Sequence, residues 1–398
     1  MKVSALGRVF SSSFYNKDLA ERNLEVSSVS KASEHSRSRS ASLPSFGLES
    51  KSNVDFIFMQ RELVKTNISH RKKPLYELAT KNHKETAELS SDIETKFLKG
   101  IKRLVVIGDS LSDSHGRMRS KTLGIMLSSR QYHEGRFTNG FVWPDFISSD
   151  GYLKKYIKDK DDRENFKLFN YAEGGAVTAR YSKLDPTFIL ISHMSRQIRK
   201  HEKKQGFKQG DMVVLALSAN DYMTFSKRDI KKVLNCYRNQ ITKLVEKKGV
   251  KHILVTGVPD LSTTAYAHQQ GKEYQDKMSK ISHEHNIEMQ AMLRELNKAY
   301  QSEGVMIRFF DFGGELNNLA VKAKTIGYNT KTEQQAGYVD LWRYFGFKGN
   351  SESFDPAHRH VFHDQVHPSQ EVHQILASRM CDFIVKEFGQ SGSDNIAE

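Results

Sequence analysis

The chain has 398 residues, of which 38% are hydrophobic, so it can build the core of one large domain with an appendage, or the cores of two domains. It contains no run of about 18 apolar residues, which excludes a membrane-spanning helix. The formal net charge of +14 is spread along the chain without the interleaved aromatic residues of a base-stacking surface, so we expect no nucleic-acid partner and a surface that favours anionic lipid or an acidic protein face.

The N-terminal region differs in composition from the rest of the chain. Residues 11–50 contain 13 serines and few large apolar side chains, too few to offset the chain entropy lost on folding. We therefore expect residues 1–52 to be disordered. Apolar spacing returns in residues 53–100, which we expect to form a helical accessory region. Gly7 and Arg8 interrupt the first apolar residues, so a conventional signal peptide is not expected.

From residue 101 onward, short apolar runs alternate with longer amphipathic segments. This alternation is typical of an α/β fold in which a doubly wound parallel sheet carries helices on both faces. We assign residues 101–390 to this domain and 391–398 to a flexible tail. Residues 311–363 lack clear periodicity and are expected to form a lid or a specificity insertion. The predicted strands are 104–107, 168–171, 212–217, 252–256 and 305–310, and the predicted helices are 189–204, 230–248, 274–300 and 369–388, the last with Ser369 as its cap.

Residues capable of acyl-transfer chemistry follow three of these strands and precede the last helix. Ser110 comes just after the first strand, Gly175 after the second and Asn220 after the third, whereas Asp364 and His367 share one short loop. Ligands of such sheets bind at the carboxyl ends of the strands, so we expect these loops to form one site. A serine hydroxyl, an imidazole backed by a carboxylate, and N–H donors for an oxyanion are the parts of a serine esterase.

The sequence blocks that contain these residues resemble a known family. GDSLSDS, NYAEGGA, SANDYM and DQVHP match in order the four blocks of the GDSL or SGNH esterases and lipases. Three further stretches, GRFTNGFVWPDF, GVPDLSTTAY and VFHDQVHPSQEVH, are similar to the glycerophospholipid:cholesterol acyltransferase branch of that family. The resemblance runs from Leu104 to the end of the last predicted helix and implies a flavodoxin-like SGNH hydrolase fold.

The resemblance implies a role for each of these residues. Ser110 would be the nucleophile, His367 the general base and acid, and Asp364 the carboxylate that orients the imidazole. The oxyanion hole would consist of the Ser110 N–H, the Gly175 N–H and the Asn220 side chain.

Two features of the third block leave alternatives open. Asp221 adjoins the expected oxyanion asparagine and competes with Asp364 for the role of triad acid, although the short loop to the histidine favours Asp364. Ser218 stands where the branch usually has glycine, which puts the backbone geometry around Asn220 in question.

Other polar and aromatic residues near these blocks receive structural interpretations. Asp109 and Asp113 are expected to be turn residues. Trp143, Phe137 and Phe141 are expected to pack in the core rather than line an acyl groove.

No metal or cofactor is expected. Cys236 and Cys381 belong to no ligand or disulfide pattern. The histidines between residues 358 and 373 are clustered, but their spacing matches no recognised set of metal ligands.

The resemblance implies a serine-dependent enzyme that takes an acyl chain from a glycerophospholipid. The acyl-enzyme would pass its acyl group to water, as a phospholipase A does, or to cholesterol, as an acyltransferase does. Two alternatives remain: a carbohydrate or other short-chain O-acyl esterase, because the four blocks do not fix the acyl group, and a catalytically weak effector that binds a host protein.

The branch includes bacterial effectors delivered by type III secretion, and similarity to them implies a destination and a partner. We expect a virulence protein secreted into the host cell, with the serine-rich N-terminus as export signal, and peripheral attachment to host membranes. We also expect activation by a GTP-bound Rho-family GTPase of the host.

Overall fold

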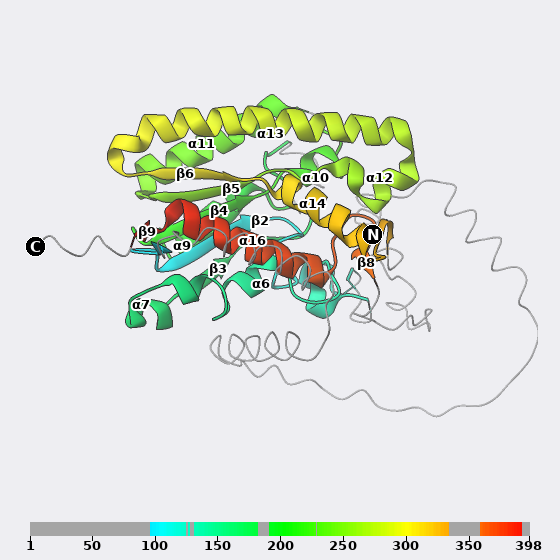
Figure 1. Cartoon of the computed structure of the whole chain (residues 1–398). Helices are drawn as coiled ribbons and strands as arrows, with labels where there is room; N and C mark the ends of the chain where they lie inside the picture. Colours follow the sequence, from blue (N-terminus) through cyan, green and yellow to red (C-terminus); the bar gives the residue numbers. More distant parts are fainter. Residues whose placement is uncertain are drawn as a thin grey trace, which may run out of the picture.

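The computed structural model describes most of the chain between residues 96 and 391 (Figure 1). The disordered segment expected over residues 1–52 lies outside the described residues, as do residues 53–95 of the expected accessory region and residues 392–398 of the expected tail. The described residues are 96–124, 126–127, 131–181, 191–227, 229–333 and 359–391.

A five-stranded parallel sheet in the order β3-β2-β4-β5-β6 forms the centre of the fold. The chain starts at the second strand of the sheet, moves outward to β3 and then returns past β2, so its winding direction reverses between β2 and β4. The predicted doubly wound α/β fold is confirmed, and each of the five predicted strands overlaps an observed one. The strands are β2 (Arg103–Gly108), β3 (Lys167–Asn170), β4 (Asp211–Ala216), β5 (His252–Thr256) and β6 (Met306–Phe310).

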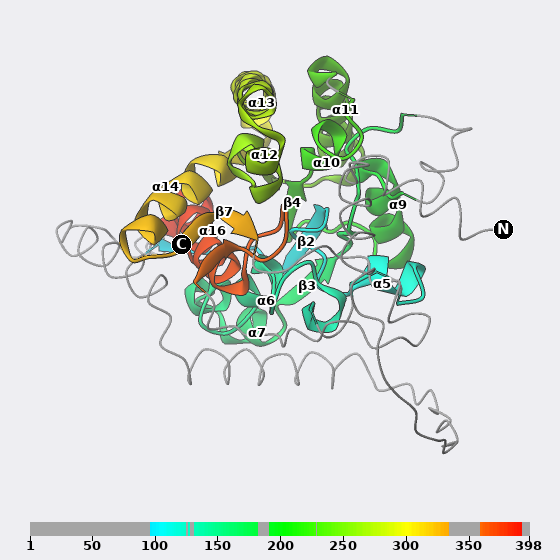
Figure 2. The same cartoon turned by 90° about the vertical axis from the view of Figure 1, so that its right-hand side faces the viewer.

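Helices cover both faces of this sheet because successive side chains of a buried strand point in opposite directions. Leu104 and Val106 of β2 pack with α6, α14 and α16, whereas Val105 and Ile107 pack with α9, α11 and α13. Figure 2 shows these two helical layers on opposite sides of the strands. The helices of the two layers are α6 (Trp143–Ile147), α14 (Phe312–Thr325), α16 (Gln370–Phe388), α9 (Met194–Lys204), α11 (Ile230–Lys248) and α13 (Lys272–Tyr300).

Shorter helices occupy the connections between these elements. No helix in the described ranges is both long enough and apolar enough to span a bilayer. The short helices are α5 (Arg117–Lys121), α7 (Lys160–Glu164), α10 (Ala219–Tyr222), α12 (Ala265–Gln270), η1 (His133–Gly135), η2 (Leu153–Tyr156), η3 (Leu261–Thr263) and η4 (Gln301–Glu303).

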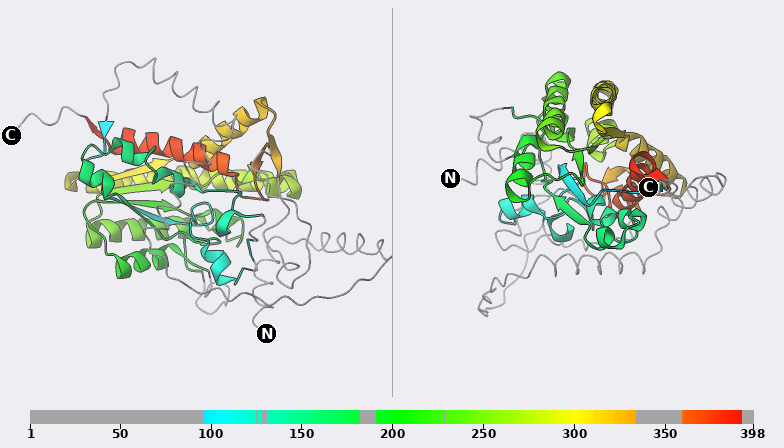
Figure 3. Two further views of the ribbon diagram at one scale, coloured as in Figure 1. Left: turned by 90° about the horizontal axis from the view of Figure 1, so that it is seen from below. Right: turned by 90° about the vertical axis from the view of Figure 1, so that its left-hand side faces the viewer.

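The C-terminal helix α16 lies along the sheet, as the red helix of Figure 3 shows. Ser369 is its N-cap residue, as predicted, but the serine side chain makes no capping hydrogen bond. The Asn139 side-chain oxygen instead accepts a hydrogen bond of 2.8 Å from the Gln370 N–H. A side chain more than 200 residues away in sequence thus accepts a hydrogen bond from a backbone N–H of the first turn, which has no partner within the helix.

Residues 311–363 were expected to lack regular structure, but α14 begins just after Asp311. The Asp311 side chain accepts a hydrogen bond of 3.0 Å from the Gly314 N–H and so caps the helix. Phe312, Leu316 and Leu319 then share one buried face. Two adjacent glycines in the first turn weaken the helical signal in the sequence. The same region contributes the two-stranded sheet of β7 (Asn329–Glu333) and β8 (His360–Phe362), and residues 334–358 lie outside the described residues.

The two ends of the domain pair with each other. β1 (Lys96–Phe97) and β9 (Gln390–Ser391) form a short antiparallel sheet, and the Lys96 ammonium donates a hydrogen bond to the Lys386 carbonyl. Residues 96–97, expected at the end of a helical region, are therefore a strand, because their backbone groups pair with the strand that follows α16.

A buried ion pair joins the starts of β2 and β4. The Arg103 guanidinium donates to both carboxylate oxygens of Asp211, at 2.6 Å for the Nη2–Oδ2 bond, and also to the Gly206 carbonyl at 2.8 Å. Asp211 is fully buried and Arg103 is 9% exposed. The hydrogen bonds within the pair take the place of the hydrogen bonds to water that each charge loses on burial.

We predict that Asp211→Ala lowers the free energy of unfolding by about 3–5 kcal/mol, because it leaves the Arg103 charge buried without its partner. Urea denaturation followed by circular dichroism measures this change. The matched control is Glu295→Ala, which breaks the exposed Arg238–Glu295 pair and is expected to cost less than about 1 kcal/mol. Equal losses in the two variants would contradict the prediction.

Candidate active site

The turn after β2 is tight and anchored from a neighbouring helix. The Gln197 side chain of α9 accepts a hydrogen bond from the Gly108 N–H and donates one to the Gly108 carbonyl, both at 2.9 Å. A Cβ atom on Gly108 would lie 2.8 Å from the Ser112 Cβ, so only glycine fits without a shift. The Asp109 carboxylate accepts the Leu111 N–H at 3.1 Å, as expected of a turn residue. Ser110 is therefore held at the carboxyl end of β2.

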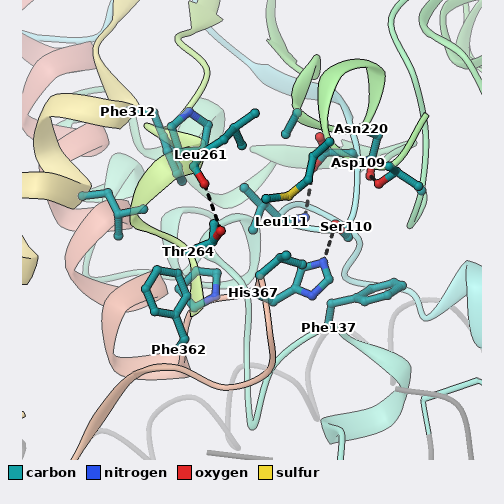
Figure 4. Close-up of a pocket in the computed structure, with 18 of the residues that line it drawn as sticks. Asp109, Ser110, Leu111, Phe137, Asn220, Leu261, Thr264, Phe312, Phe362 and His367 are labelled. Carbon is teal, nitrogen blue, oxygen red and sulfur yellow. Dashed lines mark hydrogen bonds between the residues drawn. The ribbon is translucent and has the colours of Figure 1, made fainter. Parts of the chain in front are cut away.

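Ser110, His367 and Asp364 lie in hydrogen-bonding contact. Figure 4 shows the bond between Ser110 and His367. The distance between Ser110 Oγ and His367 Nε2 is 2.7 Å, and His367 Nδ1 lies 2.8 Å from each oxygen of Asp364. A carboxylate only accepts hydrogen bonds, so the imidazole proton belongs on Nδ1 and Nε2 is free to accept the serine proton. These residues are thus arranged as a nucleophile, a base and an orienting carboxylate.

Asp364 is fully buried and ionised. Burial alone would raise the pKa of this carboxyl group, but the adjacent His367 imidazole, the nearby His363 and the Val366 N–H together hold the pKa below the usual value. The carboxylate also accepts the N–H groups of Val366 at 2.9 Å and His367 at 2.8 Å, and the Tyr132 hydroxyl at 2.9 Å.

Asp221 occupies a different environment. Its carboxylate accepts the Thr178 N–H at 2.8 Å, the Tyr181 hydroxyl at 2.5 Å and the Ala179 N–H at 3.4 Å. Burial raises its pKa to about 6. The structure therefore places Asp364, rather than Asp221, against the imidazole of His367, and Asp221 holds the loop that follows Gly175.

Three groups at the same edge of the sheet offer N–H donors. Gly175 has a φ of +74°, a conformation that favours glycine. Within the described ranges, the N–H groups of Ser110 and Gly175 donate to no protein acceptor. Asn220 donates one amide hydrogen to the Ala176 carbonyl at 3.0 Å, which leaves the second for another acceptor. All three residues line one pocket.

Ser218, whose position the sequence resemblance associates with glycine, adopts a backbone conformation that favours glycine. Its φ is +111°, a strained value for a residue with a side chain. Its buried hydroxyl lies 3.0 Å from the Thr178 hydroxyl and donates to the Tyr237 hydroxyl at 3.4 Å. The Asn220 side chain, whose oxygen accepts the Thr224 hydroxyl at 2.8 Å, is thus presented to the pocket despite the substitution.

A cavity of about 60 Å³ opens beside Ser110, and most of its lining is apolar (Figure 4). The side chains come from the turn after β2, from α5, from the loops after β4 and β5, from α14 and from the β8 end. The apolar lining residues are Leu111, Met118, Met126, Phe137, Ala219, Met223, Pro259, Leu261, Phe312, Leu316, Phe362, Val366 and Pro368.

Phe137 packs in a buried apolar cluster, as expected, and also lines this pocket. Its ring centroid is 4.7 Å from that of the His367 imidazole. Gly174 makes room for the ring, because a Cβ atom there would lie 2.1 Å from Phe137 Cε2. Trp143 and Phe141 do pack in the core as expected.

Asp113 does more than form a turn. Its carboxylate accepts the Arg117 and His115 N–H groups of its own loop, and also the Gly174 N–H at 3.1 Å. The bond to Gly174 links the loops after β2 and β3. The spacing of 61 residues gives no sequence signal for it.

The clustered histidines do not form a set of metal ligands in the described part of the chain. Among the described residues, no three His, Cys, Asp or Glu side chains gather as metal ligands would. His363 and His373 are fully buried, and burial lowers their pKa values to about 4 and about 3. His358 lies outside the described residues.

We predict that Gly174→Ala lowers both esterase activity and the melting temperature, because the new methyl group must displace the Phe137 ring from His367. Overpacking of this kind costs about 1–3 kcal/mol. Activity and thermal melts of the purified variant measure both effects. Gly151→Ala is the control, since a Cβ atom at Gly151 meets nothing within 4 Å. A Gly174→Ala protein as stable and active as this control would contradict the prediction.

Comparison with known proteins places these features in a family. The family described as GDSL-like Lipase/Acylhydrolase matches residues 104–380. The chain is 34% identical over 289 residues to the secreted effector protein SseJ of Salmonella typhimurium, a match that covers 72% of this chain and 65% of that protein. It is 26% identical over 325 residues to the phosphatidylcholine-sterol acyltransferase of Aeromonas hydrophila, covering 72% and 91%.

More distant relatives were also found. The thermolabile hemolysin of Vibrio parahaemolyticus is 22% identical over 75% of this chain, and the match covers 65% of that protein. The chain thus spans less than two thirds of the length of the Salmonella and Vibrio relatives. Among solved structures, a lipolytic G-D-S-L protein from Veillonella parvula is 15% identical with a TM-score of 0.37, covering 70% of this chain and 96% of that one.

Proposed function

Because the chain belongs to the GDSL-like lipase and acylhydrolase family, we propose that it takes an acyl chain from a glycerophospholipid and transfers it to water or to cholesterol. The observation that supports this most directly is the position of Ser110 Oγ, which lies against His367 Nε2 and at the wall of an apolar pocket. The similarity to a phosphatidylcholine-sterol acyltransferase supports the choice of donor and acceptor.

The proposed reaction proceeds in two steps through an acyl-enzyme. Ser110 Oγ attacks the ester carbonyl carbon while His367 Nε2 takes the hydroxyl proton, and Asp364 stabilises the imidazolium that forms. The N–H donors of Ser110, Gly175 and Asn220 face the negative charge on the former carbonyl oxygen. The carbonyl then re-forms as the ester C–O bond breaks, and His367 gives its proton to the leaving oxygen, which releases the lysophospholipid and leaves the acyl group on Ser110 Oγ.

The second step regenerates the serine. His367 Nε2 removes a proton from water or from the sterol hydroxyl, whose oxygen attacks the acyl carbon. The carbonyl re-forms, the bond to Ser110 Oγ breaks, and the serine oxygen regains its proton from the imidazolium. Water as acceptor yields a free fatty acid, and cholesterol yields a cholesteryl ester.

The apolar lining of the pocket supports the proposal of a long-chain acyl substrate more than the volume of the pocket does. Burying a chain of methylene groups against apolar side chains is favourable by about 0.8 kcal/mol for each CH₂. A cavity of about 60 Å³ holds only a short acyl group without rearrangement. Three methionines, Met118, Met126 and Met223, line the cavity, and their unbranched side chains can change rotamer to admit a longer chain.

The small volume favours one alternative, an esterase that acts on acetyl or other short O-acyl groups. Such an enzyme needs the same serine chemistry but no room for a chain. Rates on short acetyl esters and on long-chain phosphatidylcholine distinguish the two functions. We expect the higher kcat/KM on phosphatidylcholine, and a preference for acetyl esters would contradict the lipid proposal.

We predict that Ser110→Ala abolishes ester hydrolysis, with a loss of about three orders of magnitude or more, because no nucleophile remains. Asp364→Asn is expected to lower kcat about 10³- to 10⁴-fold by disturbing the imidazole tautomer. Asp221→Asn, with circular dichroism to verify folding, tests the alternative triad acid and should have the smaller effect. Ester hydrolysis by Ser110→Ala at the normal rate would rule out the proposed mechanism.

We further propose delivery into a host cell, peripheral attachment to its membranes and activation by a GTP-bound Rho-family GTPase. The similarity to the secreted effector protein SseJ supports delivery as an effector. Incubation with phosphatidylcholine and cholesterol vesicles, with and without the GTP-loaded GTPase, tests both acceptor and activator. We expect cholesteryl ester as well as fatty acid, each formed faster with the GTPase. Equal rates with and without it would count against the partner.

A further inference from the structure

Tyr132 contacts the site from a segment to which no sequence motif assigned a role. Its side chain is completely buried, and its hydroxyl donates a hydrogen bond of 2.9 Å to Asp364 Oδ2. The two residues are 232 positions apart in the chain. The hydroxyl therefore meets the carboxylate only because the segment before η1 packs against the loop that carries Asp364 and His367.

Further contacts join the same two segments. The Gln131 carbonyl lies 2.7 Å from His363 Nε2, and the rings of Tyr132 and His363 meet edge to face with centroids 5.0 Å apart. On the other side of the loop, the Thr138 hydroxyl donates to the Pro368 carbonyl at 2.9 Å. Residues 131–138 thus hold the loop of residues 363–368 at both ends.

We propose that Tyr132 is a positioning residue for the Asp364–His367 pair, its hydroxyl fixing the rotation of the carboxylate that orients the imidazole. The inference rests on the proposed serine mechanism. Oδ1 of Asp364 accepts the backbone N–H groups of Val366 and His367, whereas the Tyr132 hydroxyl is directed at Oδ2. His367 Nδ1 lies 2.8 Å from both oxygens, so without the hydroxyl Oδ2 would keep only its contact with the imidazole and the carboxylate would lose the donor that fixes its rotation.

The hydroxyl also affects how tightly the pair holds a proton. A donated O–H places the positive end of its dipole next to the Asp364 carboxylate and opposes the positive charge of a protonated imidazole. Its removal should make the Asp364–His367 pair bind a proton more strongly. The acidic limb of the pH–rate profile should therefore move to higher pH.

Other titratable groups face this pair, but they are the same in wild type and variant. Burial raises the pKa values of Asp109, at the end of β2, and of Glu333, in β7, to about 7. Burial lowers the pKa values of His363 and of His373, in α16, to about 4 and about 3. The difference between the two profiles therefore reports the Tyr132 hydroxyl.

The test compares Tyr132→Phe with Tyr328→Phe in the full-length protein, using hydrolysis of a soluble ester. Tyr328 is a matched control, because it is also buried and its hydroxyl donates to a carboxylate, that of Glu371 at 2.6 Å, outside the pocket. For Tyr132→Phe we expect kcat to fall about 10- to 100-fold at unchanged KM, and the acidic limb to move to higher pH. Tyr328→Phe should change neither.

A double-mutant cycle separates positioning from stability. If Tyr132 acts through the carboxylate, Tyr132→Phe should cost little further activity in an Asp364→Asn background. Three results would overturn the inference. They are an additive loss of activity in the double mutant, a wild-type kcat and pH profile in Tyr132→Phe, and a loss of activity in Tyr132→Phe that follows only its lower melting temperature. Ser110→Ala is the reference variant. If it hydrolyses the ester at the normal rate, both the serine mechanism and this inference fail. If Ser110→Ala is inactive and Tyr132→Phe has normal activity, only the role of Tyr132 is refuted.

Discussion

The parallel register between β2 and β4 is the constraint on which the site depends. The two strands pair from Arg103 with Asp211 to Gly108 with Ala216, so their carboxyl ends lie level with each other. The chain leaves them in opposite directions, and the two following loops separate and leave room between them. Ser110 and Asn220 stand at the start of these loops and line the same pocket. A shift of register would separate them.

Polar bonds between loops keep this arrangement rigid. The Arg117 guanidinium donates to the carbonyls of Asn170 and Ala172 at 2.6 Å each, which ties α5 to the end of β3. The Asn170 amide in turn donates to the Ser112 carbonyl at 2.7 Å. These hydrogen bonds provide partners for polar groups that would otherwise need water. Each of them joins the segment that follows Ser110 to the segment that leads to Gly175. The nucleophile and the neighbouring donors are therefore held by the same network.

The sequence predicted those parts of the molecule that depend on local pattern. Apolar runs located all five strands of the sheet, and four short blocks indicated Ser110, Gly175, Asn220 and His367, which the structure brings to one pocket. The chosen triad acid depended on its distance of three residues from the histidine, which is also a local property.

The features that the sequence did not predict depend on contacts between distant segments. Phe137 faces His367 only because Gly174 leaves space for its ring, and the Asn139 side chain rather than Ser369 caps α16. Helix α14 was missed for a different reason, since two glycines in its first turn obscure a helix that Asp311 caps. Neither periodicity nor composition carries information of this kind.

The pairing of β1 with β9 has a consequence for how the domain is tethered. The Gly100 carbonyl lies close to Gly210, at the amino end of the sheet, and β9 follows the end of α16 that is remote from Ser369. The described chain therefore enters and leaves the folded domain side by side, at the end of the sheet opposite the loops that carry Ser110 and Asn220. A segment joined at either of these two ends is therefore attached at the end of the sheet remote from Ser110 and Asn220, and the loops that carry these two residues do not bear the attachment points.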